Sequence, residues 1–66
     1  MKIDNEKLSI AIAKERVTYK ELCKKAGIAD ITFRKIRAGT RQAKPMTIGK
    51  IAFALNVDVK EIIAEE

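Results

Sequence analysis

The sequence predicts an all-α fold, a compact five-helix bundle that forms one domain over residues 1–66. Strong helix formers dominate the chain, which holds only three glycines and one proline. Apolar residues recur at helical spacing, and capping residues divide them into short segments with brief connections. A chain of this size buries only about 60% of its unfolded surface on folding. We therefore expect a small core without a deep cavity, and a function carried by the outer surface.

The first predicted helix spans residues 4–16. Asp4 or Asn5 supplies its N-cap, because a short polar side chain accepts hydrogen bonds from the first free backbone N–H groups. Apolar residues at helical spacing then form one face of this helix. The residues of that inward face are Leu8, Ala11 and Ile12.

The second and third predicted helices follow each other closely. Thr18, with Glu21 three residues later, predicts a capping box at the start of the second helix, which ends at Gly27. The third helix spans residues 30–37 and ends at Gly39. So few residues separate the two helices that we expect a steep crossing, as in a helix-turn-helix. The inward residues of the second helix are Leu22, Cys23 and Ala26.

A basic polar loop over residues 40–45 leads to the last two predicted helices. Thr47 is expected to cap the fourth helix, and Asn56 to end it in a left-handed conformation. Asp58 and Glu61 predict a second capping box, which begins the fifth helix. The inward residues of the fourth helix are Ile48, Ile51, Ala52 and Leu55. The apolar residues near the C-terminus, which either complete the core or form a dimer surface, are Val57, Val59, Ile62 and Ile63.

The net charge of +5 is unevenly distributed along the chain. Residues 14–50 hold eleven Lys or Arg against three Asp or Glu, a balance of +8. Residues 1–13 sum to zero, and residues 51–66 hold one Lys against four carboxylates, a balance of −3. A basic middle section indicates a face that binds a polyanion, although the same charges also serve solubility.

The composition disfavours several classes of function. The chain has no histidine and one cysteine, which excludes His-based triads, internal disulfides and thiolate zinc clusters. We expect no metal, no small-molecule cofactor and no enzymatic activity. No apolar run reaches the roughly 20 residues of a membrane span. The N-terminal residues do not resemble a signal peptide, so we expect a cytoplasmic protein without membrane contact.

The third helix presents two different sides when it is drawn at about 100° per residue. Phe33 and Ile36 fall together and are expected to face the core. Ile31, Arg34 and Lys35 fall on the opposite side. A helix with two cations and no bulky aromatic residue on its outer side fits the major groove of DNA, which is about 12 Å wide. The alternative is a charged face that is merely solvated.

Residues 17–41 resemble the helix-turn-helix of the phage Cro and repressor family, also called XRE-like regulators. The family pattern has a capped helix with Leu and a small residue, an Ala-Gly-hydrophobic turn, a hydrophobic pair and a closing Gly. Residues 47–63 resemble the closing segment of the family. The resemblance implies a lambda-repressor-like DNA-binding fold and a structural role for the cysteine, with a redox switch as the alternative. The residues that match the pattern are Leu22, Cys23, Ala26, Gly27, Ile28, Phe33, Ile36 and Gly39.

The resemblance implies sequence-specific binding of double-stranded DNA by a transcriptional regulator, a repressor, that reads the major groove with residues 30–37. It also implies a homodimer on DNA, because one such helix reads few base pairs and family members usually bind two half-sites. The implied base contacts are Asp30, Ile31 and Lys35. The implied phosphate contacts are Thr18, Tyr19, Arg34, Thr40, Arg41, Lys44 and Thr47. The alternative is an antitoxin-like or adaptor protein that binds a partner protein through its acidic C-terminal residues.

Three residues depart from the family pattern. Tyr19 stands where the family commonly has Gln, and its hydroxyl still donates to a phosphate. Arg37 stands where Glu is common, so it either pairs with Glu15 or adds to the DNA surface. Ala29 replaces the usual Ser or Thr cap of the third helix, so Asp30 either caps this helix or contacts a base.

Overall fold

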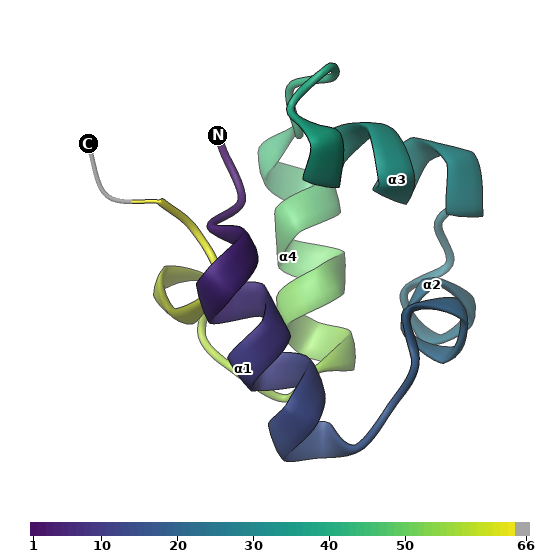
Figure 1. Cartoon of the computed structure of the whole chain (residues 1–66), viewed down its shortest axis with the longest axis vertical. Helices are drawn as coiled ribbons and strands as arrows, with labels where there is room; N and C mark the ends of the chain where they lie inside the picture. The colour runs from purple at the N-terminus through teal and green to yellow at the C-terminus, as the bar shows by residue number, and fades with distance from the viewer. Residues whose placement is uncertain (65–66) are drawn as a thin grey trace.

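The computed structural model describes residues 1–64. These residues form four α-helices and one turn of 3-10 helix, joined by short loops (Figure 1). The elements are α1 (Asn5–Glu15), α2 (Tyr19–Ala26), α3 (Asp30–Ala38), α4 (Pro45–Ala54) and the 3-10 turn η1 (Val59–Glu61). The segment α3 lies across one end of the molecule beside the start of α4, and α2 and η1 pack against α4. The predicted all-α fold with a helix-turn-helix is confirmed. None of the helices in these residues has the length and apolar character that crossing a membrane requires.

The expectation of a fifth α-helix is wrong. The predicted capping box does form, since the Asp58 N–H donates to the Glu61 carboxylate at 2.9 Å. The chain then makes only one 3-10 turn, because Ile62 is buried in the core and Ile63 pairs with Ile3 in an isolated antiparallel bridge. Extended pairing directly after residue 61 is incompatible with a longer helix.

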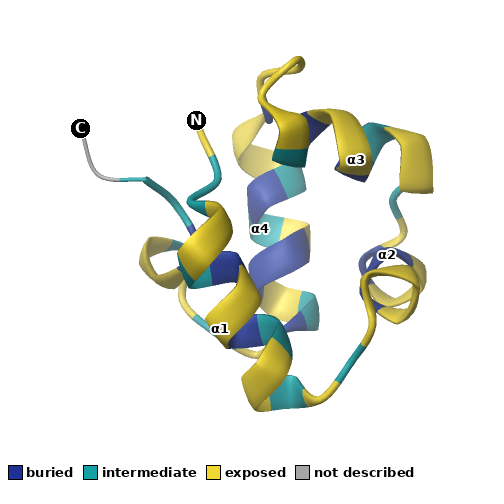
Figure 2. Cartoon of the chain, in the orientation of Figure 1, coloured by how far each residue is buried: buried dark blue, intermediate teal, exposed yellow. Residues whose placement is uncertain are grey.

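Apolar side chains from all the helices meet in one core. Figure 2 marks the buried residues of the helices in dark blue. The fully enclosed members are Leu8, Leu22, Phe33, Ile48, Ile51, Leu55 and Ile62. Val57, Val59 and Ile63 are partly buried and pack against this core. The apolar residues near the C-terminus therefore contribute to the core, as one of the two predicted alternatives states, and a role of their exposed parts in a dimer stays a prediction.

The predicted caps set the boundaries of α1 and α2. The side chain of Asp4 accepts a hydrogen bond from the Lys7 N–H at 3.1 Å. The Thr18 hydroxyl accepts from the Glu21 N–H, and the Glu21 carboxylate accepts from the Thr18 N–H, both at 3.0 Å. The second of these bonds lowers the pKa of Glu21, because it favours the ionised carboxylate. Asn56 adopts the predicted left-handed conformation, with φ of 57°.

The helix α4 begins earlier than predicted. Its N-cap is Lys44 and its first residue is Pro45, so the predicted cap, Thr47, lies inside the first turn. Proline suits the first helical position, because its φ is already helical and the N–H that it lacks has no partner there.

The two ends of the described chain run side by side. The Asp4 N–H donates to the Ile62 carbonyl at 2.9 Å, and the Ala64 N–H donates to the Lys2 carbonyl at 3.0 Å. The bridge between residues 3 and 63 lies between these hydrogen bonds. This pairing, which the sequence did not predict, holds the segment after η1 against the start of α1.

Candidate nucleic-acid interface

A tight turn sets α3 against α2. Gly27 has φ of +72°, and the N–H groups of Gly27 and Ile28 donate to the Cys23 carbonyl at 2.9 and 3.0 Å. A residue with a Cβ is strained in this left-handed conformation, so glycine is suited to the position. The chain re-enters a helix at Asp30, and α3 crosses α2 steeply, as predicted (Figure 1).

The inner side of α3 anchors this helix to the core. Phe33 and Ile36 are 2% and 6% exposed, as predicted. On the opposite side Ile31 is 55% exposed, and Arg34 and Lys35 are also exposed. The predicted division of the helix is confirmed, so one aliphatic group and two cations lie together on its outer side.

Asp30 opens α3 at the crossing with α2. The N-cap is Ala29, and within residues 1–64 no side chain caps this helix, so Asp30 is its first residue and not its cap. The Asp30 carboxylate lies beside the buried thiol of Cys23. Burial raises the pKa of the Cys23 thiol, and the neighbouring Asp30 carboxylate raises it further. The neutral thiol is a poor nucleophile, which fits a structural role for Cys23.

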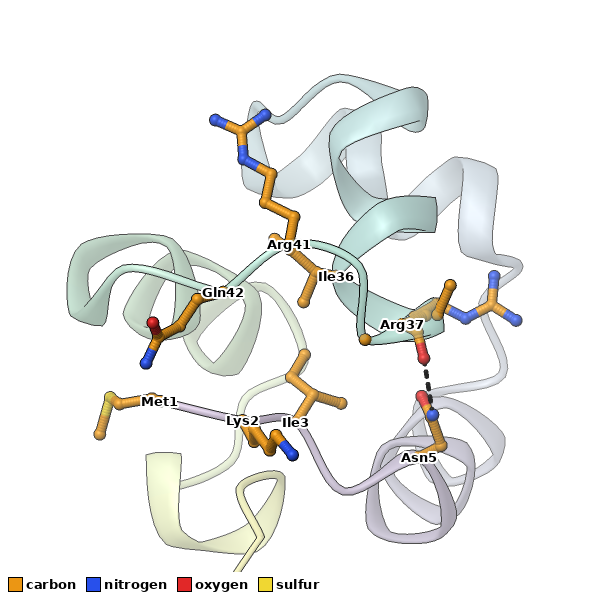
Figure 3. A pocket seen from close by; sticks show the side chains of 10 residues that line it. Met1, Lys2, Ile3, Asn5, Ile36, Arg37, Arg41 and Gln42 are labelled. Carbon is orange, nitrogen blue, oxygen red and sulfur yellow. Dashed lines mark hydrogen bonds between the residues drawn. The ribbon is translucent and has the colours of Figure 1, made fainter.

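Arg37 stacks on Tyr19, a contact that the sequence did not predict. The guanidinium carbon of Arg37 lies 3.7 Å from the centroid of the Tyr19 ring and 5.6 Å from that of Phe33. Across the described residues, its side-chain partners are these two rings and not Glu15, so the predicted pair with Glu15 does not form and the contribution of Arg37 to the DNA surface stays a prediction. Asn5 Nδ2 donates to the Arg37 carbonyl at 2.8 Å, which ties the end of α3 to α1 (Figure 3).

A hollow of about 240 Å³ lies between α2 and α3. Its lining includes the cations Lys20, Arg34 and Arg37, together with Tyr19 and the carboxylate of Asp30. Lys20, which is exposed in the first turn of α2, was not among the predicted contacts. Lysine and arginine side chains donate charge-assisted hydrogen bonds to phosphate oxygens, and a tyrosine hydroxyl donates a neutral one.

The loop between α3 and α4 holds further predicted phosphate contacts. Arg41 and Lys44 are exposed. Arg41 lines a cavity of about 460 Å³ beside the loop, and its guanidinium points away from the other lining side chains (Figure 3). The Thr40 hydroxyl donates to the Lys35 carbonyl at 3.2 Å, so it closes the end of α3. Thr47 is half-buried in the first turn of α4.

The starts of α3 and α4 leave backbone N–H groups without a cap. In the part of the chain that the structure describes, neither Ala29 nor Lys44 makes a side-chain capping bond. By contrast, Asp4 and Thr18 close the starts of α1 and α2 with their own side chains. Free N–H groups at a helix start attract anions, because they are unpaired donors at the positive end of the helix dipole.

Residues 7–65 match the family described as the Cro/C1-type HTH DNA-binding domain. The chain belongs to this family. Neither a search of curated proteins nor a search of solved structures gave a significant match.

The Cro/C1-type HTH domain binds DNA in a sequence-specific manner and acts in transcription regulation. Domains of this family are typically not enzymes. The matched residues cover α2, α3, α4 and η1 in full, and α1 from Lys7 onward. The contacts of individual residues with bases and phosphates stay predictions.

Proposed function

We propose that this Cro/C1-type HTH domain is a repressor that reads the major groove with the outer side of α3. The observation that supports the proposal is that Ile31, Arg34 and Lys35 share one exposed side of α3 while the opposite side is buried. A rigid helix with short and basic outer residues inserts into the groove and carries its donors to the base edges.

Three residues of α3 are proposed to read the bases. The ammonium of Lys35 donates to guanine O6 and N7, and the Asp30 carboxylate accepts from cytosine N4. Ile31 contacts a thymine methyl group. Each good polar pair of this kind discriminates against a wrong base by about 1–3 kcal/mol.

Contacts with phosphates are proposed to hold α3 in register. The uncapped starts of α3 and α4 and the cations around the hollow between α2 and α3 support this step. Thr40 is the weakest member of the predicted set, because its hydroxyl and its N–H both donate to the Lys35 carbonyl. The proposed phosphate contacts are Thr18, Tyr19, Arg34, Thr40, Arg41, Lys44 and Thr47. We add Lys20 and Arg37 to this proposal, because both line the hollow between α2 and α3.

We further propose that residues 1–66 act as one domain that binds DNA as a homodimer. Family geometry places two half-sites about one helical turn apart, with a recognition helix in each major groove. A dimer that occupies the duplex in this way represses by excluding other proteins from the same site.

Two measurements test the proposed function. The first is a titration against mixed-sequence duplex DNA at several salt concentrations. With six or more phosphate contacts, the affinity is expected to fall by about 10³ or more between 50 and 200 mM salt. The second is a selection of bound duplexes from a random DNA pool, which is expected to recover two inverted half-sites.

Weak binding with little dependence on salt, together with a pool that shows no enriched sequence, would contradict the proposal. That outcome would favour the adaptor alternative, in which the main contact is with a partner protein.

A further inference from the structure

The outer side of α4 carries apolar residues that no other described residue covers. Phe53 is 89% exposed and Met46 is 73% exposed. They stand two helical turns apart with Gly49 between them, so the three positions form one line along the helix. A Cβ placed on Gly49 would meet nothing within 4 Å among the described residues. We call these three residues the α4 stripe.

The α4 stripe contributes nothing to the core. The same helix buries Ile48, Ile51 and Ala52 on its other side, where α2 and η1 pack. A large apolar side chain in water is unfavourable, and no packing among residues 1–64 offsets the exposure of Phe53. Adjacent exposed apolar groups of this kind mark an interaction surface.

We propose that the α4 stripe is the surface through which a second copy of this chain pairs on DNA. The inference rests on the proposed function, which requires two copies with both α3 helices facing one duplex. The helix α4 starts beside α3 and runs toward the far end of the molecule, away from the DNA-facing end (Figure 1). A two-fold axis parallel to α4 therefore keeps both α3 helices on the same side.

This axis makes the α4 stripe self-complementary. Because the axis runs along α4, the two helices are parallel and each stripe residue meets the same residue of the second copy. Gly49 has no side chain, so the two helices approach closely at the middle of the contact. Phe53 then packs on Phe53 of the second copy on one side of this point, and Met46 packs on Met46 on the other side.

The area of the α4 stripe predicts that pairing depends on DNA. A phenylalanine buries about 150–250 Å², so two stripes together provide less than the roughly 1,200 Å² that stable interfaces bury. Lys50, which is exposed beside the stripe, also meets the same charge in the second copy. Binding to neighbouring half-sites of one duplex holds the two copies next to each other, which offsets this repulsion. The free chain is therefore a monomer, and two copies bind DNA cooperatively.

The test uses duplexes that the unsubstituted chain recovers from a random DNA pool, each in an intact form and in a form with one half scrambled. The unsubstituted chain is expected to bind the intact duplex as two cooperative copies and the scrambled duplex as one. Phe53→Gln is expected to weaken binding to the intact duplex at least tenfold and to leave binding to the scrambled duplex unchanged. The melting temperature of the free variant should stay the same, because Phe53 is outside the core.

Ile10→Gln is the matched control. Ile10 is 63% exposed on α1, a helix that does not contribute to the stripe, so its replacement removes a similar apolar group elsewhere. We expect Ile10→Gln to bind both duplexes as the unsubstituted chain does.

A crosslinking experiment tests the direction of pairing. In a Cys23→Ala background, Phe53→Cys is expected to form a disulfide-linked dimer when the protein is oxidised on the intact duplex, and a monomer when it is oxidised without DNA. When Phe53→Cys and Met46→Cys chains are mixed on the intact duplex, a disulfide that forms only between the two different variants would overturn the parallel arrangement.

Two further outcomes would overturn the inference while leaving the proposed function standing. One is unchanged cooperativity in Phe53→Gln, and the other is a stable dimer of the free chain at micromolar concentration. Failure of the unsubstituted chain to recover any sequence would instead contradict the proposed function itself.

Discussion

At the scale of single residues, replacing either of two glycines by alanine is expected to change the free energy of unfolding in opposite directions. Gly27 has φ of +72°, whereas Gly49 has an ordinary helical conformation inside α4. Gly27→Ala is expected to lower the free energy of unfolding by about 1–2 kcal/mol, because a Cβ is strained in the left-handed region. Gly49→Ala is expected to raise it by about 1 kcal/mol, because alanine is a better helix former. Denaturant unfolding of the free proteins measures both, and shifts in the same direction would contradict the assignment.

Replacement of two neighbouring cations of α3 is expected to change DNA binding in two different ways. Lys35→Ala should relax the preference for one base pair, at a cost of about 1–3 kcal/mol on the preferred sequence. Arg34→Ala should weaken binding to all sequences and lower the salt slope by about 1, because it removes a phosphate contact. Selection from a random pool and salt titration separate the two effects. An equal loss on all sequences for Lys35→Ala would show that it contacts only phosphate.

The sequence predicted which residues of α3 point inward, but not the partner of Arg37. The inward position of Phe33 and Ile36 follows from helical periodicity, which is a local property. The stacking of Arg37 on Tyr19 joins positions on different helices, and their distance depends on how α2 crosses α3. The available signal was that both residues depart from the family pattern, a change that a direct contact explains.

At the scale of elements, the capping box of α2 makes stability depend on pH. The hydrogen bond from the Thr18 N–H lowers the pKa of Glu21 below its ordinary value of 4.5. A lowered pKa means that the carboxylate stabilises the fold at pH values above 4.5, and that this contribution is lost as the pH falls through the lower folded-state pKa.

The variant Glu21→Gln keeps an acceptor oxygen but does not titrate. We expect the melting temperature of the unsubstituted chain to fall more steeply than that of Glu21→Gln when the pH is lowered from 6 to 3. Parallel curves for the two proteins over this range would show that Glu21 does not stabilise α2 in its ionised form.

The helix boundaries were predictable where a cap is a local pattern of side chains. The boxes that begin at Thr18 and Asp58 involve residues three positions apart, so the sequence identifies them directly. The start of α4 was predicted at Thr47 because threonine is a frequent cap, but Pro45 begins the helix without any side-chain cap. The length of the last helix was not predictable either, because Ile63 pairs with a residue at the other end of the chain.

At the scale of the whole molecule, the core has little redundancy. Ile62, beyond η1, is fully buried among residues of the helices. Ile62→Ala is expected to lower the free energy of unfolding by about 2–5 kcal/mol. A core of this size rarely supplies more than about 3–5 kcal/mol, so the variant should be partly unfolded at room temperature by far-UV circular dichroism. Ile31→Ala, at a position that is 55% exposed, serves as the control and should retain its melting temperature.

The overall architecture was predictable because most of it follows from local sequence. Capped helices, short connections and the glycine turn before α3 predict an all-α helix-turn-helix without reference to distant contacts. The role of the C-terminal apolar residues was left open between core and dimer surface, because periodicity does not say which apolar surface a small core encloses. The exposed positions of Phe53 and Met46 were not identified as a surface from the sequence for the same reason.

The pairing of residues 2–4 with residues 62–64 brings the two termini of the described chain together. A short linker could therefore join them, and new termini could be opened in another exposed loop. Such a circular permutant would carry the same core and the same α3 surface on a rerouted backbone.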